Sequence, residues 1–322
     1  LDDRFAVSSH FCAGIICMQT LVNLSSRPLG PERRAAGHGA RGVARMTVAF
    51  STVIVDGYDL AEGLSLLAAA GVDEVEPAFI GGYMPFSEAT FTPAAGSELG
   101  RMIAGNGLTA RAISAHIDLG AHDSAARLLR RLDFALAMGV TTVISNATSA
   151  DRAEAFRATL RAVLPEFARA GAVLALENPG HGSGALIPNG AAGAQVAAAI
   201  GRPSLRLNYD IGNAVTYARG EIDIAADLAA ALPWAVRLHL KDVAPAGEDW
   251  VFCALGQGFV GYGTRVLAGP CANLPPVAIE HPLRLWRPGR GDPVARPLVP
   301  DPSEVQRAVA SSVRFLGKLG IA

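Results

Sequence analysis

Residues 172–213 read AVLALENPGHGSGALIPNGAAGAQVAAAIGRPSLRLNYDIGN, and this stretch contains the pattern that recurs along the chain. An apolar run at 172–178 leads into a glycine-rich loop and an alanine-rich segment ending near Gly201, and a second run follows at 205–213. Near-continuous apolar runs are typical of strands buried on both faces of a parallel sheet. Because glycine readily takes the left-handed conformation in which many helices end, Gly201 marks a helix C-terminus. The stretch therefore predicts a strand, a helix and a second, parallel strand.

The same alternation continues from Met46 to the last residue. The eight runs are 47–55, 72–79, 108–116, 140–147, 172–178, 205–213, 235–242 and 276–282. Glycines follow the expected helices at intervals of 34, 34, 32 and 30 residues, at positions 71, 105, 139, 171 and 201, which fits a repeated unit. We therefore predict an α/β fold, a single-domain (β/α)8 TIM barrel. A doubly wound sheet is the alternative, but the turn VIVDGYDL (53–60) lacks the GxGxxG fingerprint common there.

The first 45 residues have a different composition. They include the stretch RPLGPERRAAGHGARGVAR (27–45), which is rich in glycine, arginine and proline and has no hydrophobic period. We predict that residues 1–45 are an N-terminal extension, either poorly structured or upstream of a functional start at Met46. The barrel domain is then expected to span residues 46–322.

Charge and cysteine usage argue against several classes of protein. Lysine and arginine number 28 against 29 acidic residues, so the basic excess typical of nucleic-acid-binding domains is missing. No run of 18 apolar residues occurs, and we expect no membrane-spanning helix. The four cysteines form no CxxC pair, which argues against a structural zinc site. We expect a cytoplasmic protein that binds neither nucleic acid nor membrane.

Polar residues stand at the ends of seven of the eight runs. They are Glu76, His116, Asn146, Glu177, Asp210, His239 and Glu280. In TIM barrels the active site lies at this end of the strands, so these side chains are expected to converge on one mouth. Charged groups are rarely buried unless they are paired or bind a metal.

Four of these residues lie on consecutive runs, from the fifth to the eighth: Glu177, Asp210, His239 and Glu280. Three carboxylates at close range repel one another unless a cation lies between them. A set of three carboxylates and one imidazole matches Mn²⁺, Mg²⁺ or Co²⁺ better than a thiolate-rich zinc site does. We predict one divalent metal ion, with Mn²⁺ first and Zn²⁺ as a further alternative. The competing interpretation is that the four residues form separate ion pairs.

Five motifs in order carry a family resemblance. They are ALENPGHGSG (175–184), NYDIGN (208–213), RLHLKD (237–242), LGQG (255–258) and AIEHP (278–282). In this order and strand context the chain resembles the xylose isomerase-like TIM barrels, the sugar phosphate isomerase/epimerase group. The resemblance implies a metal bound by Glu177, Asp210, His239 and Glu280. Similarity to the ketose 3-epimerases further implies that Glu177 and Glu280 are catalytic, one removing a proton and the other returning one.

These residues together predict a function. A metal that chelates a carbonyl and a neighbouring hydroxyl acidifies the C–H between them and stabilises the enediolate. We therefore expect a divalent-metal-dependent isomerase or epimerase of a small keto-sugar or sugar phosphate, acting through a metal-stabilised enediolate. Relatives of this kind imply a homo-oligomer, and the expected partner is a small sugar or polyol.

Four residues are predicted to bind substrate. His116 is placed there by the resemblance, although a core histidine is the alternative. Glu76 is expected to contact a hydroxyl, unless it pairs with a neighbouring loop. Lys241 is expected to hold an anion or polarise an oxygen, with a solvated charge as the alternative. His181 is expected in the pocket wall.

Neighbouring segments have predicted roles as well. Asp242 is expected to orient His239 by accepting a hydrogen bond from its ring. The arginine-rich loop 283–300 either covers the mouth and favours an anionic substrate or is a solvated surface loop. Asn213 stands where the ketose epimerases tend to carry a histidine, which puts a free keto-hexose substrate in doubt.

Three other functions compete with the isomerase. Inosose and dehydroshikimate dehydratases share the barrel and the metal set, and they begin with the same proton abstraction. An apurinic endonuclease needs further metal-binding histidines, and Asn146 and Asn213 occupy two of the expected places. A non-catalytic sugar sensor would be expected to lose a ligand or an acid/base group, yet all four remain.

Overall fold

The computed structural model describes residues 48–81, 85–267 and 274–321. The predicted N-terminal extension, residues 1–45, lies outside the described residues. No helix within the described ranges is long and apolar enough to cross a membrane.

Nine parallel strands form the barrel, in the order β2-β1-β11-β8-β7-β6-β5-β4-β3. Their bounds are β1 Val48–Ser51, β2 Glu74–Glu76, β3 Ala78–Phe79, β4 Ala112–Ala115, β5 Thr142–Asn146, β6 Val173–Glu177, β7 Leu205–Asp210, β8 Ala235–Leu240 and β11 Val277–Ile279. Strands β2 and β3 come from one predicted run, which divides at Pro77, a residue without a backbone N–H. Since β2 pairs with β1 and β3 pairs with β4, this divided run closes the ring. The predicted TIM barrel is confirmed.

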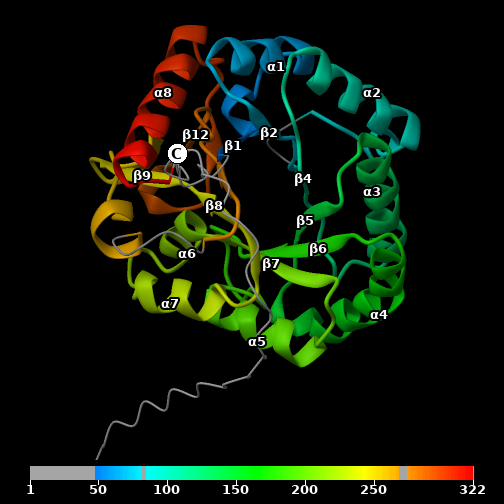
Figure 1. Ribbon diagram of the computed structural model, residues 1–322. Coiled ribbons are helices and arrows are strands. Elements are labelled where there is room, and N and C mark those ends of the chain that lie inside the picture. Colours follow the sequence, from blue (N-terminus) through cyan, green and yellow to red (C-terminus); the bar gives the residue numbers. More distant parts are fainter. Residues whose placement is uncertain (1–47, 82–84, 268–273, 322) are drawn as a thin grey trace, which may run out of the picture. The chain divides into compact units, whose positions relative to one another are not determined.

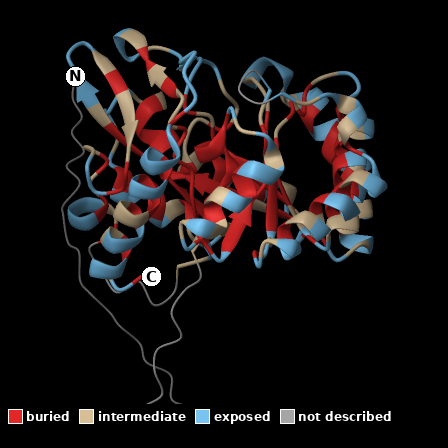
Figure 2. Ribbon diagram, turned by 90° about the horizontal axis from the view of Figure 1, so that it is seen from above, coloured by how far each residue is buried: buried red, intermediate tan, exposed pale blue. Residues whose placement is uncertain are grey.

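Helices surround the strands (Figure 1). They are α1 Leu60–Ala69, α2 Pro93–Gly105, α3 Ser124–Met138, α4 Ala153–Arg169, α5 Gly190–Ile200, α6 Ile211–Tyr217, α7 Ile224–Ala231 and α8 Pro302–Lys318. Gly139 and Gly201 end α3 and α5 in the left-handed conformation, at φ 87° and 61°. Figure 2 shows buried residues concentrated in the central strands and on the inner faces of the helices, with exposed residues on their outer faces.

A second, antiparallel sheet departs from the simple repeat. It has the order β13-β12-β10-β9, with β9 Asp242–Ala246, β10 Asp249–Cys253, β12 Leu285–Arg287 and β13 Val294–Ala295. Strand β9 begins two residues after β8 ends, and β12 begins shortly after β11. The sheet is therefore built from the segments that follow two adjacent barrel strands, on the side where the active site of such a barrel lies. The predicted loop 283–300 contributes two of its strands.

An aromatic cluster packs α3 against the strands. Phe79, Phe91 and Phe134 meet edge to face, with ring centroids 5.2–5.5 Å apart. The guanidinium of Arg131 lies 3.9 Å from the Phe91 ring, and its side chain is fully buried. Arg131 Nη2 donates to Glu88 Oε1 at 2.7 Å, so the buried charge is paired.

Replacing Glu88 by glutamine is expected to lower the free energy of unfolding by about 1–2 kcal/mol, because Arg131 loses a charged acceptor. The hydrogen bond from Arg131, opposed by burial, lowers the pKa of Glu88 to about 2 from its ordinary value of 4.5. A lowered folded-state pKa stabilises the protein above 4.5, and that contribution is lost as the pH falls through about 2. Urea titrations across pH should therefore show the deficit of the variant at neutral pH and its disappearance near pH 2.

The matched control is Glu154→Gln, which removes the exposed partner of Arg161 on α4. Exposed ion pairs contribute little, so this variant should stay within about 0.5 kcal/mol of the parent. Equal losses in the two variants would contradict the assigned role of Glu88.

Candidate metal centre

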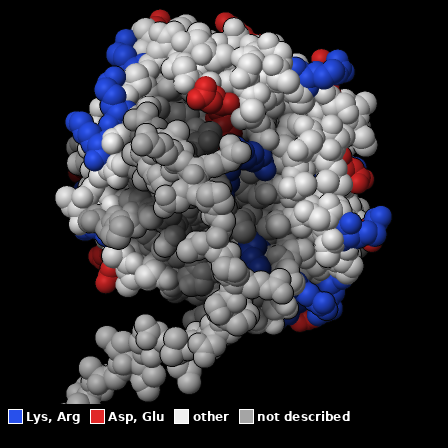
Figure 3. Space-filling view, viewed as in Figure 1, with Lys and Arg blue, Asp and Glu red and all other residues white. Residues whose placement is uncertain are grey.

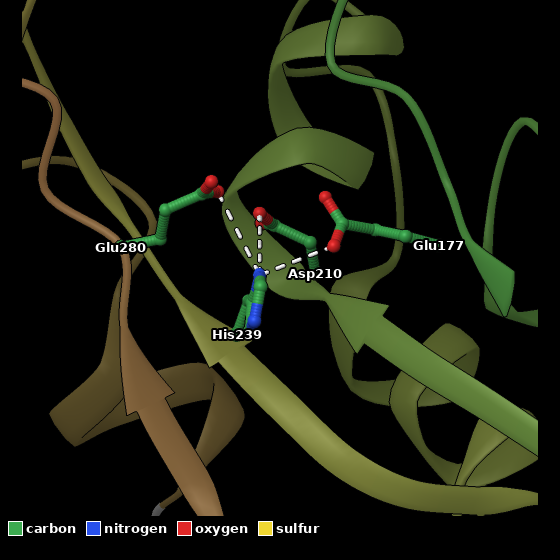
Figure 4. Close-up of side chains that lie close together, drawn as sticks. All are labelled: Glu177, Asp210, His239 and Glu280. Carbon is green, nitrogen blue, oxygen red and sulfur yellow. Dashed lines mark ion pairs between the residues drawn. The ribbon is translucent and has the colours of Figure 1, made fainter. Parts of the chain in front are cut away.

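Four side chains from consecutive barrel strands converge at one point (Figure 4). Glu177 and Asp210 are the last residues of β6 and β7, His239 lies in β8, and Glu280 directly follows β11. Each offers one ligand atom, and these four atoms all lie within 4.8 Å of one another. All four residues are buried. The parallel register explains the convergence, because it pairs Asp210 with His239 and His239 with Ala278, two residues before Glu280.

The nitrogen Nδ1 of His239 faces the three carboxylates. It lies 3.2 Å from Glu177 Oε2, 3.7 Å from Glu280 Oε2 and 4.0 Å from Asp210 Oδ2. His239 Nδ1, Asp210 Oδ2 and Glu280 Oε2 are buried, and the two carboxylate oxygens also pair with the ammonium of Lys241. Buried carboxylates need positive charge nearby, so oxygens gathered around one imidazole nitrogen are suited to a shared cation. The donor set of three oxygens and one nitrogen fits a hard or borderline divalent metal.

The buried acids and bases of this cluster shift one another's pKa values. Burial raises the pKa of Asp210 to about 7, and the carboxylates of Glu280 and Glu177 add to this shift. Burial would also raise the pKa of Glu280, but Lys241 and His239 hold it well below its usual range. Burial lowers the pKa of His239, yet Glu76 and Glu177 raise it well above its usual value on balance. The pKa shifts of Glu280 and Asp210 thus have opposite signs, and a cation among the three carboxylates would relieve their mutual repulsion.

Lys241 is buried against the same carboxylates. Its Nζ lies 2.5 Å from Glu280 Oε2 and 3.0 Å from Asp210 Oδ2, and it donates to Asn213 Oδ1 at 2.9 Å. Only 7% of the residue is exposed, so the interpretation as a solvated charge is wrong. Its pKa is raised by Asp210 and Glu280 despite the opposing effect of burial.

A cavity of about 530 Å³ adjoins the cluster, and two of the four candidate ligands, Glu177 and Glu280, belong to its lining. Three of the four residues predicted to bind substrate line the same cavity, namely His116, His181 and Lys241. His116 Nε2 lies 3.6 Å from Glu177 Oε2. Burial, together with the charges of Arg287 and Lys241, lowers the pKa of His181.

The predicted loop 283–300 contributes to this cavity. Arg284 and Arg287 both belong to its lining, and Arg287 is almost fully buried. Arg284 Nη1 also donates to Asp56 Oδ2 at 3.1 Å. The interpretation of this whole segment as a solvated surface loop is therefore wrong. Figure 3 shows Lys, Arg, Asp and Glu side chains scattered along the outer edge of the face in view.

Glu76, which we expected to bind substrate, does not belong to the cavity lining. It is fully buried, and its Oε1 lies 2.7 Å from His239 Nε2. Arg237 Nε lies 2.5 Å from the other oxygen. Burial raises the pKa of Glu76, but His239 and Arg237 more than offset that effect, so the net shift is downward.

Asp242 also differs from its prediction. It accepts hydrogen bonds from the backbone N–H groups of Val243, Gly256, Gly258 and Val260. The carboxylate therefore shapes the LGQG loop, and Glu76 takes the position next to His239 that we predicted for Asp242. Gly258 has to be glycine in this arrangement, because a Cβ there would lie 2.2 Å from Asp242 Oδ1.

Two asparagines donate hydrogen bonds to the carboxylate of Glu177. We did not predict this role for them from the sequence. Asn208 Nδ2 donates to Oε2 at 2.7 Å, and Asn213 Nδ2 donates to Oε1 at 3.2 Å. Asn208 lies two residues before Asp210 in β7, hence on the same face of the strand. That spacing is the signal that could have identified it. Gly180 fits tightly against Asn213, since a Cβ would lie 2.3 Å from its Oδ1.

Comparisons with known proteins agree with this fold. A structure of D-psicose 3-epimerase with D-fructose matches at a TM-score of 0.63 and 12% identity, over 86% of this chain and 100% of that one. A probable 3-DHS dehydratase, AsbF, from Bacillus anthracis matches at 0.58 and 13%, over 82% and 98%. A xylose isomerase-like TIM barrel protein from Mycobacterium smegmatis, in complex with magnesium, matches at 0.58 and 16%, over 87% and 98%.

Sequence comparison gives a family assignment. No curated protein sequence matches the chain. The family model for the xylose isomerase-like TIM barrel matches residues 64–265, which is more than half of the 322 residues. The chain belongs to the xylose isomerase-like TIM barrel family.

Proposed function

We propose that the protein is a divalent-metal-dependent isomerase or epimerase of a small keto-sugar or sugar phosphate. The observation that carries this proposal is the convergence of Glu177, Asp210, His239 and Glu280 within 4.8 Å beside a cavity of about 530 Å³. That volume accommodates a small molecule. Structures of sugar epimerases with the same fold support the choice of substrate class.

A bound metal would hold the substrate oxygens and stabilise the negative charge that develops when a neighbouring C–H loses its proton. Epimerisation needs one group to remove a proton and another to return it on the opposite face. We assign these roles to Glu177 and Glu280. Both line the cavity, and they come from β6 and the end of β11, which are separated in the ring by β7 and β8.

The remaining cavity residues would orient the substrate. We assign His116, next to Glu177, and His181 to substrate hydroxyls, and Lys241 to a substrate oxygen or anionic group. We propose Mn²⁺ as the metal, with Mg²⁺, Co²⁺ and Zn²⁺ as alternatives, because no thiolate belongs to the ligand set. The Mycobacterium smegmatis relative with magnesium is consistent with a hard cation.

A dehydratase is the second candidate. The structural match to AsbF covers 98% of that protein's chain. Dehydration begins with the same removal of a proton beside a carbonyl. Lys241, Arg284 and Arg287 in the cavity lining would suit an acidic substrate. The two reactions differ only after the proton has left.

The test is a substrate screen with defined metal content. Protein stripped with EDTA and reloaded with Mn²⁺ is incubated with keto-sugars, inososes and their phosphates, and products are followed by mass spectrometry and NMR. A product of equal mass supports the isomerase, whereas loss of water with new ultraviolet absorption supports the dehydratase. Metal-free protein is the control and is expected to be at least about 100-fold slower. Equal rates with and without metal would contradict both candidates.

A further inference from the structure

The ring nitrogen of His239 that points away from the carboxylate cluster has a carboxylate partner of its own. Nε2 lies 2.7 Å from Glu76 Oε1, and both side chains are fully buried. Because a carboxylate only accepts hydrogen bonds, Nε2 must carry the proton and donate it. In a neutral ring this leaves the lone pair on Nδ1, the nitrogen that faces Glu177, Asp210 and Glu280.

Glu76 is itself held from two sides. Ser114 Oγ donates to the same Oε1 at 2.8 Å, and Arg237 Nε lies 2.5 Å from Oε2. Arg237 Nη2 in turn donates to Glu74 Oε1 at 3.3 Å. Glu74 and Glu76 are two residues apart in β2, and Arg237 and His239 are two residues apart in β8. Each pair therefore projects from one face of its strand, into the barrel.

Successive contacts inside the barrel connect four polar residues: Glu74, Arg237, Glu76 and His239. Interiors of TIM barrels are filled mainly by layers of branched apolar side chains. Burying charges costs solvation energy, and well-packed apolar residues of similar volume often stabilise a protein as well or better. Stability alone therefore does not account for two carboxylates and a guanidinium in this core. Of these three groups, Glu76 contacts His239 directly, and this contact suggests a role besides stability.

We propose that Glu76, held in place by Arg237, is a positioning residue that fixes the ring orientation and tautomer of His239, so that Nδ1 is available to a divalent cation. The inference rests on the proposed metal centre and not on which reaction follows. Partners of this kind, which accept the second N–H of a metal-binding histidine, typically change metal affinity by about 10–100-fold when they are removed.

The experiment measures Mn²⁺ affinity of the full chain by calorimetry, starting from metal-free protein. The double variant Glu76→Leu/Arg237→Met removes the acceptor without leaving the guanidinium unpaired. We expect its Mn²⁺ dissociation constant to rise about 10–100-fold. The matched control is Glu74→Gln, an equally buried carboxylate of β2 that contacts Arg237 and not His239. Its dissociation constant should stay within about threefold of the parent, since the contact with His239 is retained.

A second readout separates positioning from a general structural role. Histidine is labelled with ¹⁵N and the protein is loaded with diamagnetic Zn²⁺ for NMR. The parent should show a protected Nε2–H signal that a His239→Gln variant lacks. This signal should persist in Glu74→Gln and be lost or shifted in Glu76→Leu/Arg237→Met. Circular dichroism melts of the metal-free proteins check that each variant folds.

The outcomes are distinct. Parent-like Mn²⁺ affinity in the folded double variant, or an equal loss in Glu74→Gln, would overturn the proposal. If the double variant does not fold, the spectrum of the Zn²⁺-loaded parent decides, with a protected Nε2–H of His239 expected and its absence overturning the proposal. A parent that binds no Mn²⁺ defeats both this inference and the metal centre. Weakened Mn²⁺ binding without turnover of any sugar supports this inference and defeats only the proposed function.

Discussion

Replacing Glu280 by glutamine is expected to reduce turnover by about 10²–10⁴-fold, the usual contribution of a positioned general acid or base. Glutamine preserves the size of the side chain and an oxygen that can contact a cation, but it neither accepts nor returns a proton at physiological pH. Glu280 lines the cavity and is almost fully buried, so water is a poor substitute for it. The measurement is kcat for whichever sugar the screen identifies.

The assay is run at saturating Mn²⁺, because Glu280 is also a candidate ligand and Lys241 would lose part of its ion pair. The control is Glu98→Gln, the same chemical change at an exposed position of α2. It should leave kcat unchanged. Near-normal turnover by the Glu280 variant with metal bound would remove this residue from the catalytic pair.

Replacing Asp210 by asparagine is expected to weaken Mn²⁺ binding by about 100-fold or more, since one of three anionic ligands is lost. The same residue caps α6, where Asp210 Oδ1 accepts a hydrogen bond from the N–H of Asn213 at 2.7 Å. Asparagine caps helices about as well as aspartate, so the fold should be retained. This variant therefore tests the loss of Mn²⁺ affinity while the N-cap hydrogen bond of α6 is retained.

The measurement is thermal unfolding with and without Mn²⁺. A ligand at 100 times its dissociation constant stabilises the folded state by about 2.7 kcal/mol, and this metal-dependent stabilisation should largely vanish in the Asp210 variant. The control is Asp59→Asn at the N-cap of α1, where the carboxylate accepts from the N–H of Ala61. That variant should keep the full metal-dependent shift. Equal shifts in both variants would show that Asp210 does not bind the metal.

The barrel and the four candidate ligands could be predicted because each depends on local pattern and strand order. The glycines after α3 and α5 and the apolar strand runs mark the repeated unit. Once the strands are parallel and consecutive, residues at their ends must meet at one rim. Asp210 and His239 are thus brought together by register, without any long-range information in the sequence.

The side-chain contacts that hold the four candidate ligands in place could not be predicted in the same way. The alternating spacing of Arg237 and His239 in β8, and of Lys241 directly after it, indicates that all three point inward, but not which residue each contacts across the barrel. Glu76 was expected at the mouth because it ends a strand, yet the division at Pro77 lets the chain continue as β3 beyond it. Similarly, the antiparallel sheet joins segments 35–37 residues apart in the chain, such as Trp250 opposite Arg287, and neither segment alone specifies this pairing.

The most direct test is the anomalous scattering of a crystal grown with Mn²⁺ and measured at the manganese absorption edge. We expect one strong peak per chain, and our assignment is that Glu177, Asp210, Glu280 and the Nδ1 atom of His239 coordinate it. A crystal whose manganese lies elsewhere, or whose four side chains contact no cation at saturating Mn²⁺, would contradict it.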